Sequence, residues 1–123
     1  MVDGMKVLTV PSSQQDLARA RRELEMERVL ERTSLEKFSW RRAGFGSVMI
    51  ANFTIENRND FAVRDIVVRC SFDAASGTQI GQTRETIYQR FPARKRTAVK
   101  DFSFGFIPAQ TERAGCRVNR HRF

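Results

Sequence analysis

The chain has 123 residues, of which 41% are hydrophobic and ten are phenylalanine, and its formal net charge is +8. This length suits one folded domain with an appendage, and the apolar content excludes a disordered chain. No stretch reaches the roughly 20 apolar residues that a membrane helix needs, and the first ten residues are too short to hold the apolar region of a signal peptide. We therefore expect neither a signal nor a transmembrane segment in these residues, and whether an anchor once preceded them is left open.

The positive charge is concentrated in one part of the chain. Residues 1–40 contain seven basic and seven acidic side chains, whereas residues 41–123 contain fifteen basic and seven acidic ones. The whole excess of charge therefore lies in the second part of the sequence.

The first 37 residues divide into two segments. Residues 1–12 are predicted to be a disordered N-terminus or a remnant of cloning. Ser13 with Asp16 three residues later has the spacing of a helix N-cap, and no Gly or Pro follows as far as residue 33. Residues 13–37 are therefore predicted to form a charged helix or stalk.

The apolar residues of this helix do not form one stripe. Leu17 and Leu24 share a face, whereas Met26 and Val29 fall on nearly the opposite side at 100° per residue. This pattern favours a solvated stalk that touches the domain near its end. A helix that mediates dimerisation, or that stands next to a membrane, is the alternative.

After residue 37 the apolar residues alternate with a period of two, which is typical of β-strands. Turn residues separate the alternating segments, and no helical pattern lies between them. The strands are predicted around residues 38–40, 49–55, 66–72, 78–81, 85–91, 102–106 and 114–118. This spacing predicts a mainly β protein with one N-terminal α-helix. The domain is predicted to be an immunoglobulin- or fibronectin-like antiparallel β-sandwich of six or seven strands over residues 38–118. A basic C-terminal tail is predicted at 119–123.

Three phenylalanines, Phe102, Phe104 and Phe106, alternate along one predicted strand. Aromatic residues at this period are expected on the core face of a sheet. The alternative is that they line an open groove.

The sequence carries no recognisable catalytic set. It has two cysteines without a CxxC pair and a single histidine, which excludes the common zinc-site spacings. The carboxylates of residues 56–112 are scattered singly, so none is paired for acid–base chemistry. We therefore expect no enzyme activity, no metal and no cofactor.

Two groups of residues remain as candidate sites. Strand parity places Cys70 and Cys116 on predicted core faces, so they form either a disulfide or two buried thiols. Basic residues gather near residues 90–100 and near the C-terminus, and if the two groups lie side by side they attract phosphates or anionic headgroups. A solvated basic face is the alternative. The candidate basic patch contains Arg90, Arg94, Lys95, Arg96, Lys100, Arg113 and Arg117.

The segment 68–80 resembles the FxLYD-type domains and their late-embryogenesis-abundant relatives. In those domains a small polar turn and a valine-rich strand precede an "LYD" motif, followed by Gly and an apolar residue. Phe72 and Asp73 take the places of the aromatic and the acid, whereas Ser71 replaces the leucine. The resemblance covers residues 47–118. The chain is also similar to a bacterial domain of unknown function from envelope proteins that carry an N-terminal membrane segment.

These resemblances imply an extracytoplasmic β-sandwich without known chemistry, and an oxidising compartment favours the disulfide. The expected function is a non-catalytic interaction or structural module of the bacterial cell envelope, either periplasmic or membrane-associated, with a protein or a membrane surface as partner. The alternative is electrostatic binding of nucleic acid through the basic patch.

Overall fold

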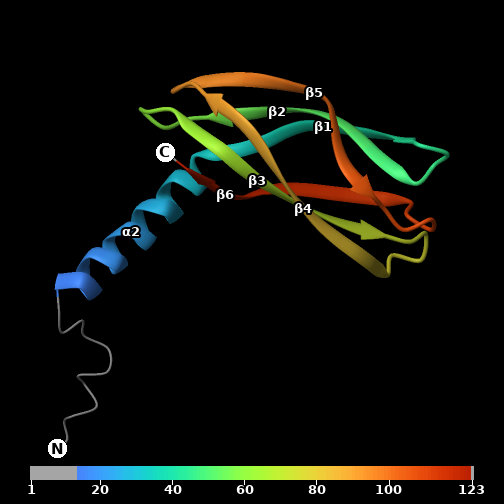
Figure 1. The fold of residues 1–123 in the computed structure, drawn as a ribbon, viewed down its shortest axis with the longest axis horizontal. Helices are drawn as coiled ribbons and strands as arrows, with labels where there is room; N and C mark the ends of the chain where they lie inside the picture. Colours follow the sequence, from blue (N-terminus) through green and yellow to red (C-terminus); the bar gives the residue numbers. More distant parts are fainter. Residues whose placement is uncertain (1–13, 123) are drawn as a thin grey trace, which may run out of the picture.

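The computed structural model describes residues 14–122, and side chains for residues 14–120, as one helix followed by six strands (Figure 1). The helix, α2, spans Gln14–Glu31 and projects from one end of the strand region. The predicted N-cap Ser13 and the predicted segment 1–12 lie outside the described residues. The strands are β1 (Thr33–Ala43), β2 (Val48–Asn57), β3 (Val63–Asp73), β4 (Gln79–Phe91), β5 (Lys95–Phe106) and β6 (Arg113–Arg122).

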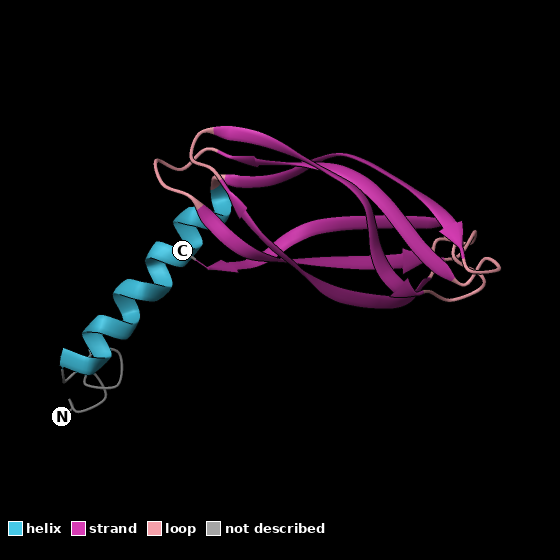
Figure 2. Ribbon diagram, turned by 45° about the horizontal axis from the view of Figure 1, so that its top comes forward, coloured by secondary structure: helices cyan, strands magenta, loops and turns pink. Residues whose placement is uncertain are grey.

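The six strands form two three-stranded antiparallel sheets that pack face to face (Figure 2). One sheet has the order β1-β2-β5 and the other has the order β4-β3-β6. These orders match strands A-B-E and C′-C-F of an immunoglobulin-type sandwich. At the two open sides, β1 contacts β6 and β4 contacts β5. The predicted mainly β sandwich with one N-terminal helix is therefore confirmed.

Alternating residues of the two sheets fill the space between them. The fully buried side chains include Met49 and Ile55 of β2, Phe72 of β3 and Phe104 of β5. The Phe53 ring lies 6.1 Å from the Phe104 ring, so aromatic side chains from adjacent strands pack together. Burial of each large apolar side chain stabilises the fold by roughly 1.5–3 kcal/mol, and this core holds both sheets in place.

Three residues with positive φ interrupt the alternation of their strands. Lys37 (φ 54°), Asp65 (φ 51°) and Asp101 (φ 52°) each lie at a shift of the strand register. One extra residue in a strand reverses which positions face the core. The apolar pattern therefore changes parity at each of these points.

The sandwich extends beyond its predicted boundaries. Strand β1 begins at Thr33, so residues 33–37 are strand and not part of the stalk. Strand β6 continues to Arg122, so most of the predicted C-terminal tail belongs to a sheet. The predicted strands at 78–81 and 85–91 are one continuous strand, β4. The polar residues between them are typical of an edge strand, whose side chains meet water.

The row of three phenylalanines is only partly in the core. Phe104 is buried and Phe102 is partly buried, as predicted, but Phe106 is 83% exposed and its prediction is wrong. The reason is backbone geometry, because Gly105 has a φ of 78° and the register of β2 and β5 shifts nearby. This break ends the alternation before Phe106.

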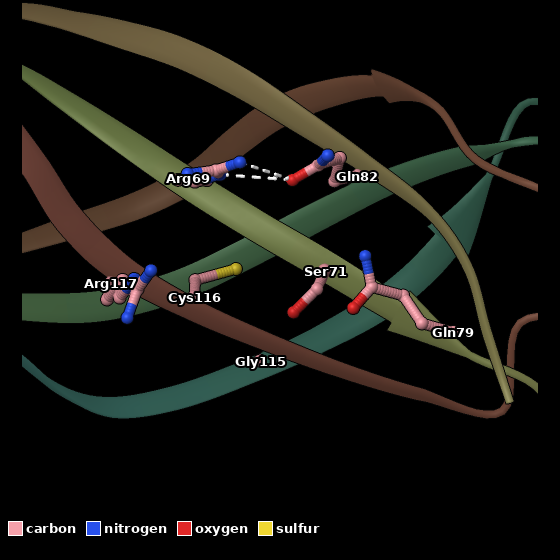
Figure 3. A pocket seen from close by; sticks show the side chains of 7 residues that line it. All are labelled: Arg69, Ser71, Gln79, Gln82, Gly115, Cys116 and Arg117. Carbon is pink, nitrogen blue, oxygen red and sulfur yellow. Dashed lines mark hydrogen bonds between the residues drawn. The ribbon is translucent and has the colours of Figure 1, made fainter. Parts of the chain in front are cut away.

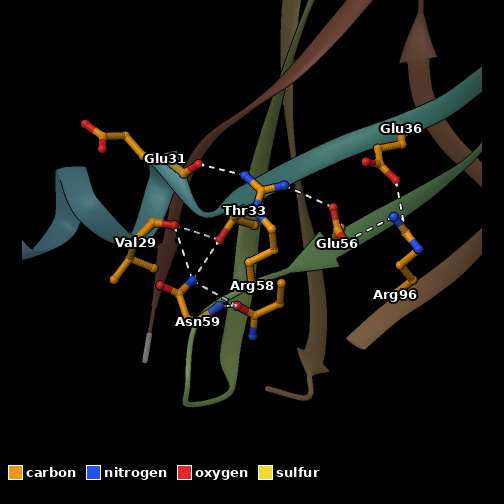
Figure 4. A network of polar contacts seen from close by, with 9 residues as sticks. Val29, Glu31, Thr33, Glu36, Glu56, Arg58, Asn59 and Arg96 are labelled. Atoms are coloured by element: carbon orange, nitrogen blue, oxygen red, sulfur yellow. Dashed lines mark hydrogen bonds and ion pairs between the residues drawn. The ribbon is translucent and has the colours of Figure 1, made fainter. Parts of the chain in front are cut away.

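Side chains from the start of β1 and from the β2–β3 turn cap the C-terminal end of helix α2 (Figure 4). The carbonyl of Val29 accepts hydrogen bonds from Thr33 Oγ1 at 2.8 Å and from Asn59 Nδ2 at 3.3 Å. The carbonyl of Glu31 accepts one from Arg58 Nη2 at 3.0 Å. The last carbonyls of a helix have no partner within it, so these contacts join the helix directly to the sandwich.

Candidate functional site

The outer surface of sheet β4-β3-β6 is rich in arginine. Buried and more exposed residues alternate along β3, with Val68, Cys70 and Phe72 pointing inward and Arg69 outward. Partners directly opposite on neighbouring strands lie on the same face of a sheet. By this register the outer surface, which we name the arginine face, carries Arg64, Arg69, Arg84, Arg90, Arg113, Arg117 and Arg120.

Three of these arginines lie side by side across the sheet. Arg69 of β3 is paired directly with Arg84 of β4 and with Arg117 of β6. Neighbouring strands are about 4.8 Å apart, and like charges directly opposite each other destabilise a sheet. Within the described part of the chain, no carboxylate forms an ion pair with any of the three. An anion bound over this row would relieve the repulsion.

A hollow of about 540 Å³ lies beside the row (Figure 3). Its floor includes Ser71 and Gly115, which are opposite each other and too small to fill the space. The Arg69 guanidinium donates to Gln82 Oε1 through Nε at 3.0 Å and Nη2 at 2.8 Å, which fixes its orientation. The hollow is completed by Gln79, Cys116 and Arg117. It therefore offers guanidinium, amide and hydroxyl groups and no carboxylate, a set that suits an oxyanion.

The structure divides the predicted basic patch between the two sheets. Arg90, Arg113 and Arg117 lie on the arginine face. Arg94 lies in the turn between β4 and β5, and three further residues lie on β5 in the other sheet: Lys95, Arg96 and Lys100. The two basic clusters of the sequence therefore do not form one continuous patch.

Two of the basic residues at and after the β4–β5 turn are paired with carboxylates. Arg94 Nε donates to Asp60 Oδ1 at 2.7 Å. Arg96 lies 3.4 Å from the carboxylate of Glu36 and 3.2 Å from that of Glu56. These pairs leave less positive potential here than on the arginine face.

Four residues of the arginine face lie outside the predicted patch. Arg120 was assigned to the basic C-terminal tail, and the other three were not singled out from the sequence: Arg64, Arg69 and Arg84. The sequence does contain a feature that predicts the position of Arg69. Arg69 precedes Cys70 and Arg117 follows Cys116, so a disulfide between directly opposite residues of antiparallel strands places these two arginines opposite each other. For Arg64 and Arg84 the sequence offers no equivalent marker, because their positions depend on the register of β3 with β4.

The two cysteines form a disulfide, as one of the two sequence alternatives predicted. Cys70 of β3 and Cys116 of β6 are directly opposite, with Cα atoms 4.1 Å apart, and Cys70 is fully buried. The bond links β3 and β6 covalently, and both strands belong to the sheet that carries the arginine face. It therefore fixes the distance between these two strands and between the arginines on them.

Other candidate sites in residues 14–122 are weaker. A second hollow of about 470 Å³ lies where helix α2 meets the sandwich, but its lining places Glu25 beside Arg28 and Arg32, so a carboxylate competes there with any bound anion. In this part of the chain no group of three or more His, Cys, Asp and Glu side chains is placed to hold a metal ion. Helix α2 is not apolar enough to cross a membrane.

Comparisons of the chain with protein-family models, with curated proteins and with solved structures found no match.

Proposed function

We propose that this protein is a non-catalytic binding module that docks through its arginine face onto a polyanionic surface. The observation that carries the proposal is the row of Arg84, Arg69 and Arg117 across three strands. Such a row costs stability in the free protein, and local conflicts of this kind are expected at functional sites. The donor-rich hollow beside the row supplies further groups for phosphate or carboxylate oxygens.

The proposed location is the bacterial cell envelope, with anionic lipid headgroups as the first candidate for the polyanionic surface. The disulfide is compatible with an oxidising, extracytoplasmic compartment. The resemblance of residues 47–118 to FxLYD-type domains, and the separate similarity of the chain to a bacterial envelope domain, support this proposal. Helix α2 continues directly into the sandwich and projects from its end, and a helix-mediated dimer fits this arrangement.

Nucleic acid is the second candidate partner. Guanidinium groups bind phosphodiesters in a bidentate manner, and a strip of arginines three strands wide could follow one backbone. The paired positions of the arginine face carry no aromatic residue, but Tyr88, two residues before Arg90 on β4, has the same outward parity and is exposed. One ring offers a stacking surface for a single base, so the face as a whole suits phosphate groups better than a run of bases.

Neutralising the row of arginines should abolish most of the binding. In the variant R69Q/R84Q/R117Q we expect the affinity for phosphatidylglycerol-containing vesicles at low salt to fall about 100-fold, because each basic residue near an anionic surface contributes about 1 kcal/mol. Vesicle co-sedimentation at increasing salt concentration measures this, and the wild-type affinity should decrease as salt rises.

The matched control is R19Q/R21Q/R22Q, which removes three exposed arginines from helix α2 and so makes the same change in net charge. This control should lose no more than a few-fold in affinity. Equal losses in the two triple variants would contradict a specific face and indicate attraction by net charge alone. Strong, salt-dependent binding of duplex DNA without binding of vesicles would favour the nucleic-acid alternative.

A further inference from the structure

Two exposed phenylalanines lie at the end of the sandwich opposite to helix α2. Phe45 is at the apex of the β1–β2 hairpin with its full surface in water (111% relative exposure), and Phe106 ends β5 with 83% exposed. Val48 and Phe106 are paired, and the Ile107 amide donates to the Ser47 carbonyl at 2.9 Å, so the hairpin and the end of β5 are adjacent. We name this pair of side chains the aromatic tip.

The backbone at Phe45 is unusual for a bulky residue. Gly44, Phe45 and Gly46 have φ angles of 57°, 60° and 85°. Glycine adopts such angles readily, whereas a large side chain at positive φ is a conformational outlier that often marks a functional site. The position favours glycine for local structure, yet it holds a phenylalanine that contributes nothing to the core.

Hydrogen bonds hold this loop in shape. Ser47 Oγ donates to the Gly44 carbonyl at 2.6 Å, and Arg42 Nη1 donates to the Gly46 carbonyl at 3.1 Å. The Arg42 guanidinium also donates to the Thr111 carbonyl, which links the hairpin to the loop before β6. The loop therefore presents Phe45 outward from a fixed base.

We propose that the aromatic tip inserts into the interfacial layer of an anionic phospholipid bilayer. The two side chains protrude from the end of the sandwich, a fluid bilayer can close around them, and large apolar side chains gain free energy on leaving water. Charge complementarity argues for an anionic lipid surface, because the chain carries a net charge of +8 and Arg42 lies at the base of the hairpin at this same end of the sandwich. Arg113 also starts β6 here, directly opposite Asp73. This inference goes beyond docking by the arginine face, since insertion depends on apolar contact below the headgroups.

The test compares the wild type with F45G/F106S on vesicles of phosphatidylcholine with 30% phosphatidylglycerol. We expect the partition coefficient of the double variant to be about 100-fold lower, since full burial of one phenylalanine corresponds to about ten-fold or more. The loss should persist at high salt, whereas the loss in R69Q/R84Q/R117Q should shrink as salt screens the charges. The control L24S removes an apolar side chain that is 54% exposed on helix α2, at the other end of the molecule from the tip, and should bind as the wild type does.

Two further measurements separate insertion from misfolding and from protein recognition. F45G should unfold at the same temperature as the wild type or higher, because glycine relieves the positive φ. F45W should show a blue shift of its emission when vesicles are added. The proposal is overturned if F45G/F106S binds vesicles as well as the wild type does, or if F45W shows no emission shift on vesicles that retain the protein. It is also overturned if the wild type binds no vesicles at all. In that case the aromatic tip would fit a concave pocket on another protein.

Discussion

Reduction of the Cys70–Cys116 disulfide is expected to lower the melting temperature by about 15–20 °C. The bond joins residues with a sequence separation of 46, and the loop that it closes contains β4 and β5. Closing a loop of this length stabilises the fold by about 4 kcal/mol in the chain-entropy model. The effect should be large because β3 and β6 are neighbours in the sheet but far apart in sequence, so their pairing is costly to establish without the covalent link.

Thermal unfolding followed by circular dichroism, with and without a phosphine reductant, measures this effect. Alkylation and intact mass should show no free thiols before reduction and two after it. The variant C70A/C116A is the control, since its melting temperature should not respond to the reductant. An unchanged melting temperature in wild-type protein with both thiols alkylated would show that the sheet does not depend on the bond.

The sequence predicted the fold well wherever strict alternation holds. The inward faces of β2 and β3 follow a period of two, and this parity also placed Cys70 and Cys116 on core positions. It failed at the bulges. At Lys37 an extra residue separates Leu35 from Phe38, so the two apolar residues do not have the spacing of one strand. Residues 33–37, nearly half of β1, were therefore assigned to the stalk.

The arginine face illustrates a second limit of the sequence. Basic residues that are close together in sequence, such as Arg94 and Arg96, were predicted to form the patch, but carboxylates from β1, β2 and the β2–β3 turn neutralise them. Residues that are far apart in sequence, Arg69, Arg84 and Arg117, form the unneutralised row. Strand order and register determine which basic residues are paired with carboxylates and which form the row. The local composition of the sequence predicts neither arrangement.

Asn57 lies at the end of the sandwich next to helix α2, has no exposed surface, and makes more side-chain hydrogen bonds than the other buried polar residues at this end. Its Nδ2 group donates to the carbonyls of Phe61, Phe91 and Pro92 at 3.0–3.2 Å. Its Oδ1 atom accepts from the backbone amide of Asn59 at 3.0 Å and from Asn59 Nδ2 at 2.8 Å. Asn57 therefore connects the β2–β3 turn with the end of β4, and through Asn59 with the last turn of the helix.

Replacing Asn57 with alanine is expected to lower the free energy of unfolding by about 3 kcal/mol, because buried polar groups that lose their partners each cost about 1–3 kcal/mol. Urea unfolding followed by the fluorescence of Trp40, the single tryptophan, measures the change.

The control N52A lies on the same strand, where Asn52 Oδ1 accepts one exposed hydrogen bond from the Asp101 amide. This substitution should lower the free energy of unfolding by about 1 kcal/mol or less. In N57A, amide hydrogen exchange should also accelerate in the last turn of α2, because Asn59 loses the contact that orients it toward the Val29 carbonyl. Equal stability of N57A and N52A, together with unchanged amide exchange in the helix, would contradict the role of Asn57 in joining the helix to the sandwich.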